Sequence, residues 1–207
     1  MKYENLELCK KCGGKCCLKS GCDYSVDDFD SLSFNYLYHK LLEGNISITS
    51  SLKIIKNNNK VRLDPFLLIR ARCINSGAID LLSIKSRCSM HTINGCKYKI
   101  DERPWGGVNL IPQKDGNCYQ YKDPLEEMNR WAQYQDVLSK LVKKITGNSV
   151  DEQLRYDVIK LFEKVINKDY HNVAESEIND ILNLLPILAK IYPEEVARTV
   201  NKVKILK

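Results

Sequence analysis

Four cysteines near the start of the chain constrain its folding more than any other feature. They follow the pattern C-x2-C-x3-C-C and are Cys9, Cys12, Cys16 and Cys17. Two cysteines three residues apart can bind one metal ion, and the turn between them offers backbone N–H groups to the sulfur atoms. Gly13 and Gly14 tolerate the positive φ that a tight wrap requires. Lys10, Lys11 and Lys15 favour the thiolates that metals bind.

Five more cysteines extend this constellation. Cys22 follows the first cluster and can complete a ligand set, while Cys88, Cys96 and Cys118 form a second group near glycines. Tetrahedral sites commonly join a close pair of ligands to a distant pair. The spacing therefore predicts two four-sulfur sites, or one site with spare thiols, among Cys9, Cys12, Cys16, Cys17, Cys22, Cys88, Cys96 and Cys118. Cys73 lies in a strand-like segment, and we expect it to be a small buried side chain.

The number of cysteines also bears on the chemistry. Nine is odd, so disulfides within one chain cannot pair all of them. Residues 1–5 show no apolar run of the signal-peptide type, so we expect a cytoplasmic protein, in which clustered cysteines indicate metal or redox chemistry. Four thiolates suit zinc or an iron–sulfur cluster about equally well. The predicted cofactor is therefore one or two Zn ions or an Fe-S cluster, although the spacing differs from both common ferredoxin patterns.

The cysteine pattern resembles that of the bacterial YkgJ-like family, also called the CxxCxxxCC family. The first cluster has the family's spacing. Cys88-x7-Cys96, followed by Tyr98 and Arg103-Pro104, is similar to the family's cysteine–tyrosine–Arg-Pro segment. The resemblance covers residues 9–118 and implies a zinc- or iron-chelating domain.

The chain departs from this family pattern at one place. The family usually carries another cysteine and an arginine just after the Arg-Pro pair, where this chain has Trp-Gly-Gly-Val at residues 105–108. Cys118 is the candidate substitute for the missing ligand. The resemblance does not extend to the C-terminal part of the chain and implies nothing about it.

Composition and charge narrow the class of protein. Hydrophobic residues make up 43% and charged residues 28%, which is ordinary for a globular chain. The longest stretch without Asp, Glu, Lys or Arg is short of the roughly 18 apolar residues that a membrane helix needs, so no membrane partner is expected. The net charge of +6 lies within residues 1–123. We interpret these basic residues as balancing thiolate charge rather than as a nucleic-acid surface.

The hydrophobic pattern predicts an α+β, mostly helical fold with two parts. Residues 1–123 form a cysteine-stapled, irregular metal-binding module, and residues 124–207 form a helical bundle segment that packs on it. The module contains a helix over residues 26–42 and a small β-hairpin, because two β-branched runs flank the Asn-rich turn at residues 57–59.

Capping residues indicate where the helices of the C-terminal tail begin. Asp123-Pro124 opens the first, and Ser149 with Glu152 forms a capping box for the second. A third helix covers residues 177–191, where Pro186 is expected to kink or divide it, and Pro193 opens the last. This tail is a candidate surface for a protein partner or a homo-oligomer.

Three functions remain open from the sequence. The first is a cytoplasmic metal-binding protein in which the cysteines hold zinc or an Fe-S cluster. The second is a redox or metal-dependent enzyme that uses this centre, which needs an open coordination position or a reducible cluster. The third is a zinc-stapled nucleic-acid-binding or regulatory module. Outside the cysteines, we expect His91 to be structural and Arg103 to hydrogen-bond a thiolate or a carboxylate.

Overall fold

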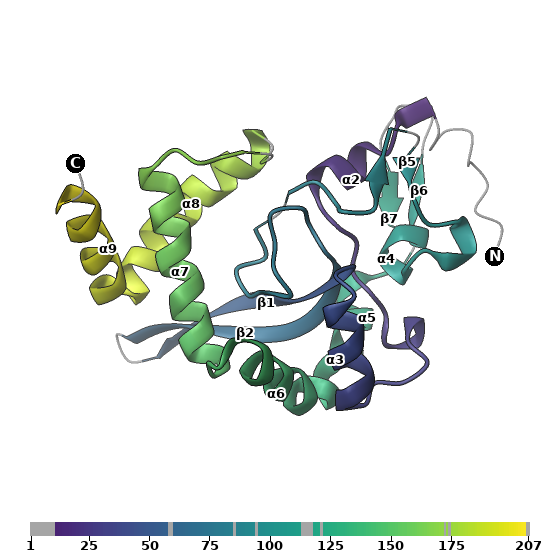
Figure 1. The fold of residues 1–207 in the computed structure, drawn as a ribbon, viewed down its shortest axis with the longest axis horizontal. Helices are drawn as coiled ribbons and strands as arrows, with labels where there is room; N and C mark the ends of the chain where they lie inside the picture. Colours follow the sequence, from purple (N-terminus) through teal and green to yellow (C-terminus); the bar gives the residue numbers. More distant parts are fainter. Residues whose placement is uncertain are drawn as a thin grey trace.

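A long β-hairpin forms the centre of the molecule in the computed structural model (Figure 1). Strand β1 (Ile46–Asn57) pairs antiparallel with β2 (Lys60–Ala71), and β3 (Ile79–Asp80) pairs parallel with β1, so the sheet order is β2-β1-β3. This confirms the predicted hairpin and the α+β, mostly helical fold class. The structure describes residues 11–57, 60–84, 86–93, 95–112, 118–120, 122–171, 173 and 175–205.

Helices surround this hairpin on two sides. Along one side lie three helices, α3 (Phe34–Leu42), α5 (Pro124–Arg130) and α6 (Gln135–Thr146), with the 3-10 turn η3 (Trp131–Tyr134) between the last two. Around the turn end of the hairpin lie α7 (Val150–Ile166), α8 (Glu175–Ile191) and α9 (Pro193–Ile205).

Short elements form a separate group at the other end of the hairpin, on the right of Figure 1. They include four of the eight cysteines in the described part of the chain, and no long helix or strand runs through them. The elements are α2 (Lys15–Lys19), β4 (His91–Thr92), β5 (Gly95–Cys96), η2 (Ile100–Glu102), α4 (Trp105–Val108), β6 (Leu110–Pro112) and β7 (Cys118–Gln120).

The predicted helix over residues 26–42 is wrong in its first half. Ser25 caps only the 3-10 turn η1 (Val26–Asp28), and the backbone of Phe29 is extended. The Phe29 ring packs against Tyr24 and Trp131, with ring centroids 5.2 and 6.0 Å apart. Packing of this partly buried ring against a distant tryptophan therefore outweighs the local helical pattern.

The C-terminal helices begin where the capping residues predicted. The Asp123 side chain accepts a hydrogen bond from the Leu125 amide, and Ser149 and Glu152 form both bonds of a capping box. Pro186 lies inside α8 and does not divide it into two helices. The missing proline N–H removes one intrahelical bond, and packing of the flanking turns holds the helix together: Ile181 and Leu188 are buried.

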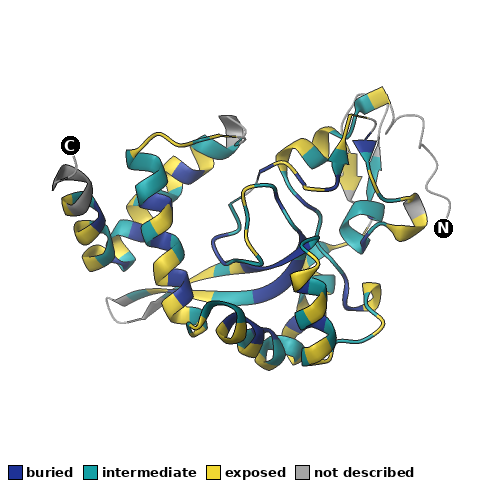
Figure 2. Cartoon of the chain, viewed as in Figure 1, coloured by how far each residue is buried: buried dark blue, intermediate teal, exposed yellow. Residues whose placement is uncertain are grey.

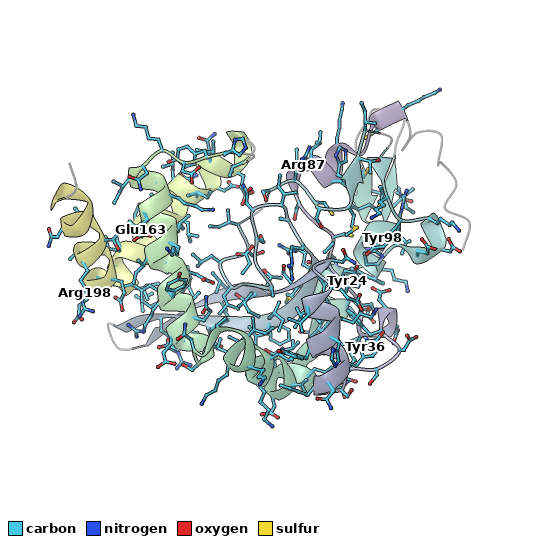
Figure 3. All side chains as sticks on the ribbon, viewed as in Figure 1. Tyr24, Tyr36, Arg87, Tyr98, Glu163 and Arg198 are labelled. Carbon is cyan, nitrogen blue, oxygen red and sulfur yellow. The ribbon has the colours of Figure 1, made fainter. Side chains whose placement is uncertain are left out.

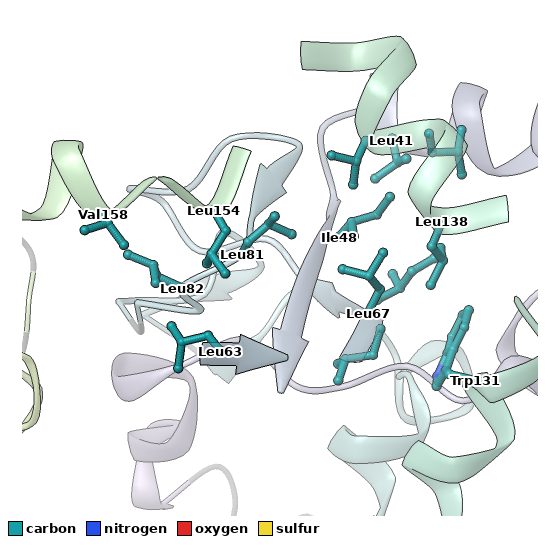
Figure 4. Packing of buried hydrophobic residues seen from close by; sticks show 14 of the residues in the cluster. Leu41, Ile48, Leu63, Leu67, Leu81, Leu82, Trp131, Leu138, Leu154 and Val158 are labelled. Carbon is teal, nitrogen blue, oxygen red and sulfur yellow. The ribbon is translucent and has the colours of Figure 1, made fainter. Parts of the chain in front are cut away.

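One hydrophobic core joins the hairpin to the helices (Figure 4). Leu41, Ile48, Leu67, Leu138 and Trp131 pack together beside the sheet, and all five are almost fully buried. The burial pattern in Figure 2 follows this arrangement, because the dark, buried residues line the faces that helices and sheet turn toward each other. The core therefore draws on both residues 1–123 and residues 124–207.

Hydropathy adds one further finding about the helices. Among the residues that the structure describes, no helix is both long and apolar enough to span a membrane. The longest ones, α7 and α8, carry charged residues on their exposed sides.

Two adjacent leucines at the end of α3 give a direct test of this core. Leu41 is 1% exposed and Leu42 is 61% exposed. We expect Leu41→Ala to lower the free energy of unfolding by about 2–5 kcal/mol, because it opens a cavity in the packed core. The matched variant Leu42→Ala should change it by less than about 0.5 kcal/mol. Urea unfolding followed by circular dichroism measures both; equal losses in the two variants would contradict this packing.

Candidate metal centre

Six cysteines from five short stretches of the chain line one cavity beside the end of the hairpin. The cavity has a volume of about 150 Å³ and lies among α2, the end of β2, β5, α4 and β7. Its other walls include Ala71, Met90, Tyr98 and Leu110, which are largely apolar. The cysteines are Cys16, Cys17, Cys22, Cys88, Cys96 and Cys118. Sequence spacing therefore grouped side chains that the fold does bring to one place.

Backbone pairing with β2 positions Cys22. The Ala71 amide donates to the Cys22 carbonyl at 2.8 Å, and the Tyr24 amide donates to the Ile69 carbonyl at 2.9 Å. Asp23 lies opposite Arg70 in this short antiparallel pairing, and their side chains form an ion pair at 2.7 Å. The segment that carries Cys22 is thus attached to the end of the hairpin by an isolated antiparallel bridge, and we call it the Cys22 strand.

Two glycines allow the chain to pass close to this strand. A Cβ atom on Gly21 would lie 1.9 Å from the Ala71 carbonyl oxygen, and one on Gly106 would lie 2.8 Å from the Asp23 backbone. The Gly106 amide donates to the Asp23 carbonyl at 2.9 Å, which brings α4 against the same segment. Any larger residue at these two positions would push the walls of the cavity apart.

A backbone hydrogen bond connects Cys17 with Cys88. The Cys88 amide donates to the Cys17 carbonyl at 2.7 Å, so the end of α2 lies against the segment that carries Cys88. Gly13 and Gly14, just before α2, have φ of 65° and 72°. This confirms that these glycines supply the left-handed backbone that the turn into α2 requires.

His91 and Cys96 lie on the small β4–β5 hairpin, where they are direct cross-strand partners. The Nε2 atom of His91 is 2.9 Å from the Gly13 carbonyl oxygen. This contact joins the hairpin to the turn before α2 and gives His91 a structural partner. Cys118 lies opposite Pro112 in the β6–β7 pairing and is exposed at the cavity rim.

The thiols within the cavity differ in acidity. Cys17, whose sulfur is 4.0 Å from that of Cys16, lowers the pKa of Cys16 to about 6 through a hydrogen bond. The pKa of Cys17 is raised, first by its hydrogen bond to Cys16 and then by burial. Burial also raises the pKa of Cys22, and it raises that of Cys88 to about 11. Without a cation, the cavity therefore favours neutral thiols at its buried end.

Arg103 and the tyrosines complete the surroundings of the cysteines. Arg103 lines the cavity, its Nε atom donates to the Tyr98 carbonyl at 3.5 Å, and its charge contributes to the lowered pKa of Cys16. Tyr98 and Tyr24 are labelled in Figure 3, and both pack against the small hydrophobic cluster that contains Cys88. Met90 and Leu110 had no sequence signal for this role, because their place in the wall depends on distant backbone pairings.

Three further cysteines, Cys9, Cys12 and Cys73, are not among the lining residues given above. Cys9 is a predicted ligand that lies outside the described residues. Cys12 is partly exposed and is not among the residues that line the cavity. Cys73 is buried, 5% exposed, and its sulfur accepts a hydrogen bond from the Gly21 amide at 3.3 Å.

The side chains, as they are oriented in the structure, do not yet form a complete set of metal ligands among the described residues. Among the described residues, no three Cys, His, Asp or Glu side chains lie close enough together to hold a metal ion. Cys16 and Cys17, at 4.0 Å, come near the sulfur–sulfur separation of about 3.8 Å that a tetrahedral zinc site with 2.3 Å bonds requires. Although they are adjacent in the chain, Cys16 and Cys17 both line this cavity.

Comparison of the chain with protein-family models, curated proteins and solved structures finds no match. The resemblance to the cysteine-cluster family therefore stays a prediction from the cysteine spacing. What the cavity can do chemically rests on its own residues.

Alkylation of the reduced, metal-free protein tests the electrostatics of the cavity. A thiol is mostly thiolate above its pKa, so Cys16, with a pKa of about 6, should react with iodoacetamide before Cys88, whose pKa is about 11. The rate at Cys16 should rise through about pH 6 and level off above it. Peptide mass spectrometry across a pH series measures this profile.

Two variants on α2 provide the comparison for this alkylation profile. Cys17→Ala should move the midpoint of the Cys16 profile up toward the ordinary value of 9.0, because it removes the hydrogen bond. Leu18→Ala changes an exposed neighbour and should leave the midpoint in place. A midpoint near 9.0 in the unmodified protein would contradict the coupling.

Proposed function

We propose that this chain is a metal-binding protein whose cysteines hold zinc or an iron–sulfur cluster in the cavity beside the hairpin. The observation that supports it most directly is that six cysteines, separated by up to about a hundred residues in the chain, line a single cavity. Thiolate sulfur is the ligand that both zinc and iron–sulfur clusters prefer in proteins.

The electrostatics of the cavity supports a cation as its occupant. Burial raises the pKa of Cys22 and Cys88, so ionising these thiols costs free energy when no cation lies beside them. A bound cation reverses that cost, because metal ions bind the deprotonated sulfur and displace its proton. Metal uptake should therefore release protons and weaken as the pH falls.

The donor set fits this chemistry in type and in number. Six thiols exceed the four that one zinc or one cluster needs, so side-chain rotations can select four of them. Cys16 and Cys17 are already near ligand spacing, whereas the other sulfurs need to turn inward. When bound, the metal would supply a cross-link among α2, the Cys22 strand, the Cys88 segment and β5.

Two further parts of the proposal rest on the cysteine pattern. The spacing of the first cluster supports membership of the cysteine-cluster family, and a reducing compartment such as the cytoplasm would keep the thiols available for metal. Neither part is needed for the cavity to bind a metal ion.

Metal content is the first experiment. The full-length protein, purified without oxygen, should contain zinc and be colourless, or contain iron with acid-labile sulfide and be brown. Elemental analysis and an absorption spectrum distinguish the two. Protein with an intact fold and reduced cysteines that contains no metal, and takes up none from added Zn²⁺ or from Fe²⁺ with sulfide, would overturn the proposal.

Two facing cysteines provide a matched pair of variants. Cys88→Ser removes a thiol that lines the cavity, and we expect metal affinity to fall by more than about 100-fold, beyond the loss typical of residues that only support a ligand. Cys73→Ser changes a thiol outside the cavity lining, and its hydroxyl can still accept the Gly21 N–H, so affinity should be unchanged. Competition with a chromophoric chelator measures both; equal effects would count against the cavity as the site.

A further inference from the structure

Cys73 and Cys88 lie directly opposite each other across a short antiparallel pairing. The Ile74 amide donates to the Arg87 carbonyl and the Ser89 amide donates to the Arg72 carbonyl, both at 2.8 Å. These two bonds flank the cysteines, which makes them a non-hydrogen-bonded pair. In such pairs the Cα atoms are about 4.5 Å apart and the side chains approach closely.

This placement is compatible with a disulfide. A disulfide spans Cα separations of about 4.4–6.8 Å, so the backbone here need not move to join the two sulfur atoms. Both residues are free thiols in the structure, and both are buried. A rotation of the side chains is then the main change that the bond requires.

Cys88 belongs to two sets of neighbours at once. It lines the cavity with the other five cysteines, and it is also paired with Cys73, which is not among the residues that line the cavity. A sulfur atom in a disulfide is no longer a thiolate and cannot serve as a strong metal ligand. Metal binding and a Cys73–Cys88 bond are therefore alternatives for the same sulfur.

We propose that Cys73 and Cys88 form a reversible disulfide that withdraws Cys88 from the metal site, so that a peroxide oxidant releases the metal. The disulfide itself depends only on the backbone pairing. The release of metal rests on the function proposed above.

The chemistry balances with hydrogen peroxide as the oxidant. The Cys88 thiolate attacks one peroxide oxygen, the O–O bond breaks, and hydroxide leaves, which gives a sulfenic acid at Cys88. The Cys73 sulfur then attacks the Cys88 sulfur, forms the S–S bond and displaces the second hydroxide. The two thiol protons and the two hydroxides leave as two water molecules, and the two sulfurs together lose two electrons. A dithiol reductant reverses the bond by exchange.

Hydrogen peroxide can reach the sulfur of Cys88 more easily than that of Cys73, as the proposed order of steps requires. Cys88 borders a cavity of about 150 Å³, which has room for a molecule as small as hydrogen peroxide, whereas Cys73 is buried and is not among the lining residues. Metal coordination holds a ligating cysteine as the thiolate, which is the form that attacks peroxide. In the metal-loaded protein Cys88 is thus the residue that reacts with peroxide, and Cys73 is the residue that then forms the disulfide with it.

The experiment treats zinc-loaded and metal-free full-length protein with hydrogen peroxide, blocks free thiols and digests with trypsin. Cleavage after Arg72, Lys85, Arg87 and Lys97 leaves Cys73 in peptide 73–85 and Cys88 in peptide 88–97. We expect these two peptides to be linked, with fragmentation assigning the bond to Cys88 rather than Cys96. A chromophoric zinc indicator should show release at the same rate, and dithiothreitol should restore binding.

Variants distinguish the Cys73–Cys88 disulfide from metal binding itself. Cys73→Ser should bind zinc as the unmodified protein does but release it about tenfold more slowly under peroxide, because the resolving sulfur is absent.

Equal release from Cys73→Ser, or a Cys16–Cys17 link in place of Cys73–Cys88, would overturn the inference. Zinc binding with no Cys73–Cys88 link would overturn it and leave the proposed function standing. A Cys73–Cys88 link in protein that binds no metal would support the disulfide and overturn the metal-binding proposal.

Discussion

The pairing of residues 22–24 with the end of β2 is the contact on which the cysteine cavity depends. Two backbone hydrogen bonds, from Ala71 to Cys22 and from Tyr24 to Ile69, make this segment an extension of the central hairpin. Ile69 and Leu67, on one face of β2, are almost fully buried in the core. The position of Cys22 is therefore supported by the hydrophobic packing of the whole sheet, although the elements around the cavity are short and irregular.

The same hairpin also connects the cavity to the helical tail. The Gln135 side chain accepts from the Leu67 amide at 2.9 Å and donates to the Leu67 carbonyl at 2.8 Å, so α6 occupies the open edge of β2. The Trp131 indole donates to the Tyr24 carbonyl at 3.0 Å, two residues from Cys22. A side-chain amide and an indole, rather than another strand, thus satisfy backbone groups beside the cysteine segment.

Burial keeps the thiols of the cavity neutral, whereas metal binding needs them charged. Apolar walls raise the pKa of its buried thiols, while metal binding needs thiolates. Cys16 is exposed and has a lowered pKa, so under the proposed function it would be the first thiolate that a cation contacts. Cys88 is buried and lines the same cavity, and it is also the backbone pairing partner of Cys73.

Local sequence determined the hairpin, the helix caps at Asp123 and Ser149, the glycine turn before α2, and the grouping of most cysteines into one candidate site. Each of these follows from residues close together in the chain or from thiol chemistry alone. Only the tertiary structure decided that Phe29 interrupts a helix, that Cys12 stands outside the cavity lining, and that Cys73 faces Cys88. Hydrogen bonds and ring packing between distant segments set these features, and cysteine spacing carries no information about which distant backbones pair.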